Sequence, residues 1–416
     1  MFTHPVRHPS SLVPAIHPQT CRWSRRLTAP RPDHDVAVIG AGPSGSRTAQ
    51  LLATRGLRVA IFERDAQPGQ PVHCTGIVST ECFERYDLPA SLVIREVRSF
   101  VLRAPSGRGT RVQRDATQAY VLDRVALDRL LADRAVQAGA ELVLGTTVED
   151  IRWDGKGVTL RMNNGGERQT ATARAAVLAT GYGAPLMARA GIEDEREVLS
   201  GCQAVVAADG VDDVEVFTGS VFGHGGYGWL VPWRPGYALA GLLTRKHTVR
   251  LMDEHLQRLR AQGRIGAVEQ VYRCRPIPLG VPKSAVADGI LAVGDVIGQV
   301  KPTSGGGIYY GLLGAEAAAD VLADALERGD LTAAALAPYD QRWRALMETE
   351  IRQGYALRRV LEQLPDAVVE NLHRVLSVPG LKRLISSTAT FDWHSGPLTK
   401  LLARLQHHDT REPAAS

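Results

Sequence analysis

The segment 34–64, HDVAVIGAGPSGSRTAQLLATRGLRVAIFER, constrains the fold of this chain more than any other stretch. Its apolar run 36–39 predicts a strand, residues 44–55 predict a helix that ends at Gly56, and 58–62 predict a second strand. A strand, a crossover helix and a parallel strand form a βαβ unit, which is the building block of doubly wound α/β domains. The sequence therefore predicts a Rossmann-like domain.

The turn between the first strand and the helix carries the pattern G-x-G-x-x-G at Gly40, Gly42 and Gly45, and Glu63 lies 18 residues after the last glycine. Such glycines permit a tight turn and the close approach of a pyrophosphate, while the helix N-terminus offers free N–H groups. An acid at the end of the second strand is suited to bind a ribose hydroxyl. Together these features predict dinucleotide binding.

The rest of the chain alternates between helical and strand patterns. The segment 122–142 contains a predicted helix that ends at Gly139. In 145–163 apolar and polar residues alternate, which predicts the strands of a β-meander. The segment 173–181 indicates a buried strand, and 197–275 is β-rich and irregular. Beyond about residue 326 the spacing of the apolar residues predicts helices, with these positions on one face: Trp343, Met347, Ile351 and Leu364.

We expect an α/β fold with a discontinuous nucleotide-binding domain and an inserted β-rich domain. The predicted parts are an N-terminal extension outside the fold at 1–33, the nucleotide-binding domain at 34–96, 120–196 and 285–325, the β-rich substrate-binding domain at 97–119 and 197–284, and a helical C-terminal region at 326–416.

Charge and hydropathy exclude some classes of function. Residues 1–32 hold five Arg, six Pro and no acid, and the remaining residues hold 44 Lys and Arg against 44 Asp and Glu, so nothing indicates nucleic-acid binding. The composition of this extension is typical of a disordered tail and also of an organelle transit peptide, and both readings stay open. The longest charge-free run, 216–233, is interrupted by five Gly, which argues against a membrane span.

The five cysteines, Cys21, Cys74, Cys82, Cys202 and Cys274, lack the spacing of a metal site, and we expect reduced thiols and no bound metal. Cys82 and Cys202 are predicted to be small buried apolar residues. Cys74 follows the second predicted strand beside turn-forming residues, so it is a candidate for the active site.

A second glycine-rich segment, GDVIGQVKPTSGGGIYYGLL at 294–313, follows the apolar run GILAV. Three consecutive residues without a Cβ, Gly305 to Gly307, cost conformational entropy and let a ligand lie directly against the backbone. The segment predicts that something flat or phosphorylated binds there.

The order of these motifs resembles the FAD-dependent hydroxylase and reductase superfamily with a glutathione-reductase-type nucleotide domain. The motifs that carry the resemblance are the first glycine turn, the acid at 63, L-D-R at 122–124, A-T-G at 179–181, and G-D at 294–295 with its glycine loop. The resemblance implies that FAD is bound, with Arg124 near its pyrophosphate or ribityl chain and Asp295 on the ribityl side. It also implies that 305–308 lie at the pyrimidine edge of the isoalloxazine.

Three segments are similar to the geranylgeranyl reductase family. PVHCTGIVS at 71–79 resembles its P-x-x-C-x-G-x-x-S signature, and YGWLVP at 227–232 resembles its Y-x-W-x-F-P, with Val231 in place of Phe. GQVKPTSGGGIYYG at 298–311 is similar to its flavin loop. The resemblance implies a reductase that saturates C=C bonds of a geranylgeranyl or related polyprenyl chain.

The resemblance also implies the site residues and partners. The catalytic candidates are Cys74, Tyr227 and Trp229. The cofactor-binding candidates are Gly40, Gly42, Pro43, Ser44, Gly45, Glu63, Arg64, Cys74, Gly76, Arg124, Val148, Thr180, Gly181, Gly294, Asp295, Gly305, Gly306, Gly307 and Ile308. We expect NAD(P)H or a ferredoxin as the electron donor, a prenyl or lipid substrate, and a cytoplasmic location. Peripheral membrane contact through an amphipathic segment at 396–406 stays open.

The chemistry of an isolated double bond suggests roles for the catalytic candidates. Such a bond is a poor hydride acceptor, so its reduction needs a closely aligned reduced flavin and a proton source for the other carbon. Cys74 is a candidate proton donor. Tyr227 and Trp229 would either stabilise positive charge on the alkene or form a packing wall. His73 and His224 fit neighbouring, non-catalytic positions better.

The same fold supports other chemistry, so alternatives remain. An FAD-dependent monooxygenase acting on an aromatic or quinone is the second hypothesis. A flavin halogenase is less favoured because Tyr227 stands where the first Trp of W-x-W-x-I-P would be and 67–79 contain no Lys. A non-redox, cyclase-like flavoprotein is the least favoured.

Overall fold

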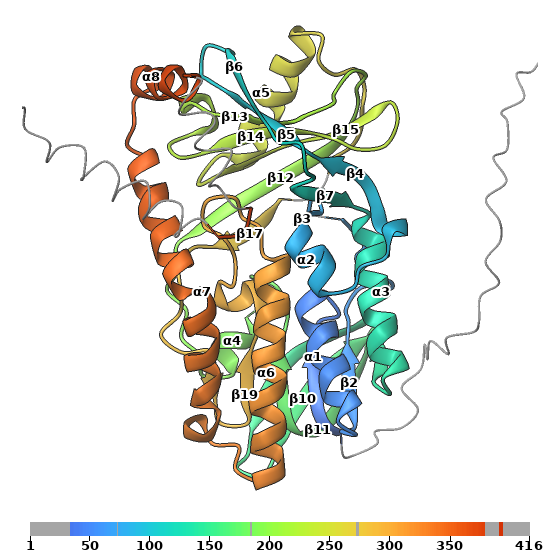
Figure 1. Cartoon of the computed structure of the whole chain (residues 1–416). Helices are drawn as coiled ribbons and strands as arrows, with labels where there is room; N and C mark the ends of the chain where they lie inside the picture. Colours follow the sequence, from blue (N-terminus) through green and yellow to red (C-terminus); the bar gives the residue numbers. More distant parts are fainter. Residues whose placement is uncertain (1–33, 73, 184, 272–273, 379–390, 394–416) are drawn as a thin grey trace, which may run out of the picture.

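The computed structural model describes residues 34–72, 74–183, 185–271, 274–378 and 391–393. His73, Cys21, the N-terminal extension and the segment 396–406 lie outside the described residues. Two large sheets are stacked along the length of the molecule, a small sheet lies between them, and helices cover their faces (Figure 1).

The first large sheet is built around the predicted βαβ unit. Its strand order is β18-β19-β11-β1-β2-β8, and β1 pairs in parallel with both β2 and β11. Its strands are β1 His34–Ile39, β2 Val59–Phe62, β8 Glu141–Val143, β9 Thr146–Trp153, β10 Val158–Asn164, β11 Glu167–Leu178, β18 Val286–Ala287 and β19 Ile290–Ala292. The long strand β11 also forms an antiparallel meander with β10 and β9, as the alternating pattern predicts.

Helix α1 (Pro43–Thr54) lies between α3 (Arg124–Gln137) and α6 (Ile308–Arg328) on one side of this sheet (Figure 1). Pro43 occupies the first turn of α1, where a missing N–H costs nothing, and Gly56 takes the positive φ of +81° that follows the helix. The predicted bounds of β1, α1 and β2 agree with the structure to within two residues.

The second large sheet is mainly antiparallel. Its order is β16-β12-β15-β14-β13-β5-β6, with β17 also pairing to β12. Its strands are β5 Ser99–Arg103, β6 Gly109–Gln113, β12 Val198–Ala207, β13 Val214–Phe217, β14 Tyr227–Pro232, β15 Tyr237–Thr244, β16 Val268–Val271 and β17 Arg275–Pro278. Helix α5 (Thr248–Ala261) packs its apolar residues onto this sheet.

A three-stranded sheet in the order β3-β7-β4 lies between the two large ones (Figure 1). Its strands are β3 Ile77–Ser79, β4 Val93–Val97 and β7 Ala119–Leu122. Short helices complete the connections: α2 Thr80–Arg85, α4 Leu186–Arg189, η1 Ala90–Leu92, η2 Ser220–Phe222 and η3 Gly294–Ile297.

Helix α7 (Ala333–Leu361) runs along one side of the molecule from the first sheet toward the second, and α8 (Asp366–Leu376) lies near β6 (Figure 1). Trp343, Met347 and Ile351 are almost fully buried, which confirms the predicted apolar face. Leu364 is an exception, because α7 ends before it.

These observations confirm the α/β fold class with a Rossmann-like nucleotide domain, a β-rich sheet and C-terminal helices. The division of the chain at the stated domain boundaries stays a prediction. None of the helices formed by the described residues combines the length and hydropathy needed to cross a membrane.

Candidate active site

The turn between β1 and α1 admits only glycine at two of its three motif positions. Gly40 has φ +107°, and a Cβ there would overlap the carbonyl oxygen of Ala179. A Cβ on Gly45 would overlap the carbonyl oxygen of Gly40. Gly42 is different: its φ is −70°, and a Cβ there would meet no protein atom within 4 Å. No side chain caps the α1 N-terminus, so its N–H groups face the open side of the turn.

Glu63, at the end of β2, joins this turn to the next connection. One carboxylate oxygen accepts a hydrogen bond from Ala41 N at 2.7 Å, and the other accepts one from Asp65 N at 2.9 Å. Burial raises the pKa of Glu63, although these two hydrogen bonds oppose the shift. Arg64 is half exposed and pairs with Asp65 at 3.6 Å. Both carboxylate oxygens of Glu63 retain lone pairs that could accept ribose hydroxyls.

Arg124 begins helix α3 and is the main buried cation of the site. Its Nη2 lies 2.6 Å from Asp128 Oδ1, and its Nη1 is buried without a hydrogen-bond partner among the described residues. Gly76 lies directly against its side chain. Burial opposes the charge, but Asp128, Cys74 and Asp295 raise the pKa of Arg124. The Nη1 marks a place for an acceptor that the described residues do not supply.

Asp295 lies in η3, immediately after the last strand of the first sheet. Burial raises its pKa to about 6, and the nearby Arg124 opposes that shift. A Cβ on Gly307 would overlap the Asp295 carboxylate, so the start of α6 and η3 pack together through this glycine. Gly294, at φ +86°, lies similarly close to Ser44 at the start of α1. The first and second glycine motifs therefore meet.

Residues 299–307, here called the glycine loop, connect η3 to α6. Gln299 is fully buried; its Oε1 accepts from Gly294 N at 2.7 Å and its Nε2 donates to the Tyr339 hydroxyl at 3.1 Å. Within the loop Lys301 N donates to Gly306 O and Gly305 N to Lys301 O. The Lys301 ammonium pairs with Asp392 at 2.8 Å, and both side chains are buried. The base of the loop is thus fixed from several directions.

Strand β14 brings both predicted aromatic residues to the glycine loop. The Tyr227 hydroxyl donates to Ser304 O at 2.6 Å, and the rings of Tyr227 and Trp229 have centroids 5.7 Å apart. Burial, with a smaller contribution from Cys74, raises the pKa of Tyr227 to about 12, and the nearby Arg358 opposes this shift. Trp229 lies over Gly241 and donates from Nε1 to Gln203 Oε1 at 3.3 Å. Tyr227 is therefore the aromatic residue that contacts the loop.

A cavity of about 310 Å³ opens beside Cys74 and Arg124. Its apolar walls are Val72, Leu122 and Leu239, and Trp233 and Arg234 lie at its polar side. Cys74 is partly buried, and its Sγ accepts from Gly76 N at 3.4 Å.

The remaining predicted residues lie in separate segments around these groups. Val148 lies in β9 with a buried side chain; Thr180 and Gly181 follow β11, next to Gly40 in the first glycine turn. Ile308 is the first residue of α6. His224 lies in the turn before β14, in contact with neither Cys74 nor the glycine loop by any hydrogen bond among the described residues.

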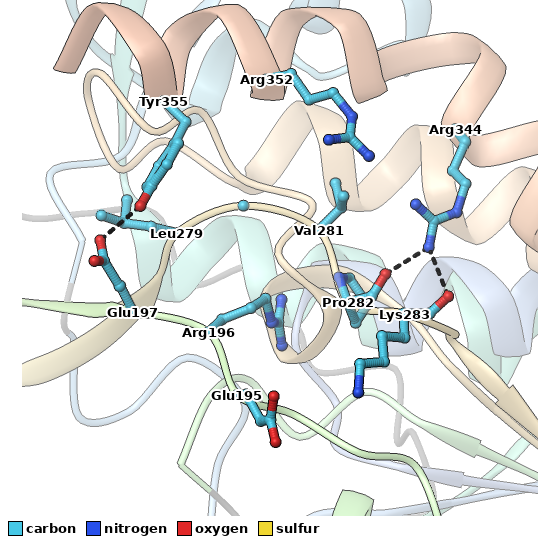
Figure 2. A pocket seen from close by; sticks show the side chains of 11 residues that line it. Glu195, Arg196, Glu197, Leu279, Val281, Pro282, Lys283, Arg344, Arg352 and Tyr355 are labelled. Atoms are coloured by element: carbon cyan, nitrogen blue, oxygen red, sulfur yellow. Dashed lines mark hydrogen bonds between the residues drawn. The ribbon is translucent and has the colours of Figure 1, made fainter. Parts of the chain in front are cut away.

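A second cavity, of about 520 Å³, lies between α7 and the segment 279–283. Figure 2 shows Arg344 donating to the carbonyls of Pro282 and Lys283, and Tyr355 donating to Glu197. Its basic side chains already have acidic partners: Arg196 with Asp194, Lys283 with Glu193, Arg344 with Asp340 and Glu348, and Arg352 with Glu348. Because carboxylates already pair with these basic side chains, the cavity attracts an anionic ligand less strongly than its number of arginines suggests.

The residues of the two glycine motifs, together with Arg124, fit a bound FAD. The uncapped α1 N-terminus at Gly42 suits a pyrophosphate, and the unpaired Arg124 Nη1 suits a polar acceptor of the same ligand. Gly305–Gly307 let a flat ring approach the backbone next to Asp295.

Comparison with known proteins identifies the family. The FAD binding domain model matches residues 33–234. The chain is 31% identical to digeranylgeranylglycerophospholipid reductase of Methanothrix thermoacetophila over 348 residues, which cover 80% of this chain and 88% of that protein. The chain belongs to this reductase family. This confirms two predictions: that the chain is a member of the geranylgeranyl reductase family, and that it is an FAD-dependent oxidoreductase.

Solved structures agree on the fold. A geranylgeranyl bacteriochlorophyll reductase-like protein of Thermoplasma acidophilum superposes with a TM-score of 0.77 at 22% identity, covering 89% of this chain and 99% of that chain. A p-nitrophenol 4-monooxygenase of Pseudomonas putida has the same fold, with a TM-score of 0.69 at 15% identity, covering 85% of this chain and 97% of that chain. The fold alone therefore does not separate reductase from monooxygenase, whereas sequence similarity assigns this chain to the reductase family.

Sequence reasoning missed the buried polar residues that fix the glycine loop. Gln299, Lys301 and Arg358 are buried polar residues in contact with the loop or within it. Cys202 was predicted only as a buried residue; it is buried, and its thiol also interacts with that of Cys274. No local sequence pattern predicts the contacts of these residues with distant segments of the chain.

Proposed function

We propose that this protein reduces C=C bonds of a geranylgeranyl or related polyprenyl chain with electrons from FAD. The observation that carries the proposal is a pair of contacts around the site: the Tyr227 hydroxyl binds the glycine loop, and Cys74 lies in the wall of a cavity that Val72, Leu122 and Leu239 also line. The family of the chain, whose named members are digeranylgeranylglycerophospholipid reductases, supports the same reaction class.

We propose that FAD extends from the first glycine turn to the glycine loop. Gly40, Gly42, Pro43, Ser44 and Gly45 would hold its pyrophosphate, and Glu63 its adenosine ribose, because these groups surround the α1 N-terminus. The remaining predicted contacts would line its path in this order: Arg64 and Val148 at the adenosine end, Thr180 and Gly181 beside the turn, Cys74, Gly76, Arg124, Gly294 and Asp295 at the centre, and Gly305, Gly306, Gly307 and Ile308 at the ring.

Reduced FAD supplies hydride to one carbon of the double bond, and the other carbon needs a proton. Cys74 Sγ is our candidate for that proton, since the thiol is partly exposed and lies in the wall of the apolar cavity. A protein acid placed there would protonate the alkene carbon without admitting bulk water. The apolar walls Val72, Leu122 and Leu239 would hold the chain and exclude solvent.

Tyr227 and Trp229 would form the wall opposite the cofactor. The Tyr227 hydroxyl stays protonated at physiological pH because its pKa is raised to about 12. It therefore acts as a hydrogen-bond donor to Ser304 O and not as a proton shuttle. We propose that its ring would stabilise positive charge that develops on the alkene.

The electron donor is proposed to be NAD(P)H or a ferredoxin. Anaerobic mixing of the oxidised protein with NADH, NADPH or reduced ferredoxin, followed at the flavin absorption band, identifies it. The donor that bleaches the flavin within seconds and sustains turnover is the physiological class; bleaching by none of them rejects both.

The surface of α8 supports an additional proposal of peripheral membrane contact. Val368, Leu372 and Val375 lie on one face of α8 and expose 41%, 42% and 52% of their surface. A lipid surface is the partner that would both cover this face and deliver a prenyl-chain substrate. Co-sedimentation with anionic phospholipid vesicles should be lost in Leu372→Glu; equal sedimentation of variant and wild type would reject the proposal.

A monooxygenase is the alternative function, because a solved monooxygenase shares the fold. Anaerobic addition of geranylgeranyl diphosphate or a digeranylgeranylglycerol phospholipid to the reduced protein separates the two. Flavin reoxidation without oxygen supports the reductase. Flavin that reoxidises only on admission of air, with an aromatic product hydroxylated, supports the monooxygenase.

A further inference from the structure

Helix α7 lies outside the matched FAD-binding segment, yet it contacts the glycine loop directly. At Gly354 a Cβ would lie 3.2 Å from Pro302 Cδ and 3.6 Å from Thr303 Cγ2. The helix backbone therefore approaches the loop as closely as a residue without a side chain permits. This position is one helical turn from Arg358, which lies on the same face.

Arg358 joins the glycine loop to the start of β14. Its side chain is 3% exposed; Nη1 donates to Pro302 O at 3.2 Å, and Nη2 donates to Gly225 O at 2.6 Å. Gly225 lies in the turn 223–226, which leads into β14 and Tyr227. One planar guanidinium thus holds two carbonyls from the two halves of the site.

The charge of Arg358 is balanced locally. Its Nε lies 3.2 Å from Glu362 Oε1, and Glu362 in turn accepts from Arg245 at 2.9 Å. Burial lowers the pKa of Arg358, while Tyr227 and Glu362 oppose this effect. The guanidinium is thus bonded to two carbonyls through Nη1 and Nη2, while its Nε has an ion-pair partner and makes no hydrogen bond among the described residues.

We propose that Arg358 is a positioning residue that sets the glycine loop against strand β14, and through it the placement of the flavin ring relative to Tyr227. The Tyr227 hydroxyl bond to Ser304 O forms a second, direct link between the same two segments. The Arg358 link or the Tyr227 link alone would let the loop rotate relative to β14. Together the two links fix both the distance and the orientation of the loop relative to that strand. This inference rests on FAD binding and does not depend on the identity of the substrate.

The test is FAD titration of full-length apoprotein, with the visible spectrum of the bound flavin as a second readout. Arg358→Gln should weaken FAD binding about tenfold, the loss expected for one hydrogen bond to a charged group, and should shift the flavin bands. Arg358→Lys should recover part of the affinity, since an ammonium keeps the charge but reaches one carbonyl only. Millimolar guanidinium should likewise restore part of the spectrum in Arg358→Ala.

Arg359→Gln is the matched control. Arg359 is next in the same helix, is 48% exposed, and pairs only with Glu197 and Glu362 among the contacts the structure gives it. It should bind FAD as the wild type does. If Arg358→Gln does not fold, Gly354→Ala replaces it, because one methyl group against Pro302 should displace the loop and weaken FAD binding.

The proposal is overturned if folded Arg358→Gln, or Gly354→Ala in its place, has wild-type FAD affinity and spectrum and differs only in thermal stability. That result would make Arg358 a structural residue of α7. These readouts need FAD and no prenyl substrate, so they stay decisive even if the proposed reaction fails its own test.

Discussion

The hydroxyl of Tyr227 donates a 2.6 Å hydrogen bond to the carbonyl oxygen of Ser304, which ties the β-rich sheet to the glycine loop of the nucleotide-binding domain. The bond crosses 77 positions of sequence and connects the two segments that would face each other across the flavin. Tyr227 therefore has two properties that can be tested separately: a hydroxyl that binds the loop, and a ring for which we propose a role in the site.

Substitutions at Tyr227 should separate these properties. Tyr227→Phe removes the hydroxyl alone and should weaken FAD binding about fivefold, the effect of one neutral hydrogen bond. Tyr227→Leu also removes the ring, and its kcat should be about tenfold lower than that of Tyr227→Phe if the ring stabilises positive charge. Equal kcat values for the two variants would assign Tyr227 to loop positioning only. FAD titration and steady-state turnover measure the two effects.

Cys74→Ala should lower FAD affinity only slightly, because it removes one small side chain from the proposed cofactor contacts, and should slow product formation about 100-fold or more, because a positioned proton donor contributes at least that factor. The thiol accepts only a weak bond from Gly76 N, so the loss of structure should be small. Single-turnover reoxidation of reduced flavin by the prenyl substrate is the measurement. A rate within threefold of wild type would remove Cys74 from the mechanism.

The two glycines Gly42 and Gly45 should respond differently to Ala. A Cβ on Gly42 meets no protein atom within 4 Å, so Gly42→Ala should leave the melting temperature of the apoprotein unchanged while weakening FAD binding. A Cβ on Gly45 overlaps Gly40 O, so Gly45→Ala should lower the melting temperature of the apoprotein itself. Comparable FAD affinity in Gly42→Ala and wild type would show that the cofactor does not approach this turn.

Asp295 should make the stability of the apoprotein depend on pH. Its folded pKa of about 6 exceeds the ordinary value of 3.8, so between these values the folded state binds the extra proton and stability falls as pH rises. Asp295→Asn should therefore stabilise the apoprotein at pH 8 by on the order of 2–3 kcal/mol, with the difference vanishing near pH 4. Denaturant unfolding at both pH values is the measurement, and a pH-independent difference would contradict this account.

The same variant should bind FAD less well than the wild type at pH 8, because an amide is a weaker acceptor for ribityl hydroxyls than a carboxylate. Opposite signs for apoprotein stability and cofactor affinity would mark Asp295 as a residue retained for binding at a cost in folding. An unchanged affinity would place Asp295 away from the cofactor.

Much of the nucleotide-binding domain was predictable because its signals are local. The spacing of Gly40, Gly42 and Gly45 within one strand–turn–helix unit determines the turn, and burial of the β1 and β2 strands follows from their apolar runs. Tyr227 and Trp229 lie two positions apart, so a strand through them places both on one face, and their adjacent rings agree with this.

The contacts of Arg358 could not be predicted in this way. Arg358 and Arg359 are adjacent in a charged helix and look equivalent in the sequence, yet one is 3% exposed and the other 48%. Only the packing of α7 against Pro302 and the turn 223–226 distinguishes them. The same holds for Lys301, whose buried partner Asp392 lies 91 positions away. Long-range polar contacts depend on the finished fold and leave no local pattern.

The most direct test of the proposed function is the mass of the product formed without oxygen. The purified protein is reduced anaerobically, mixed with geranylgeranyl diphosphate and, in parallel, with a digeranylgeranylglycerol phospholipid, and the products are analysed by mass spectrometry. The account predicts flavin reoxidation together with a gain of two hydrogens for each double bond reduced. Flavin that stays reduced with both substrates, and products of unchanged mass, would contradict it.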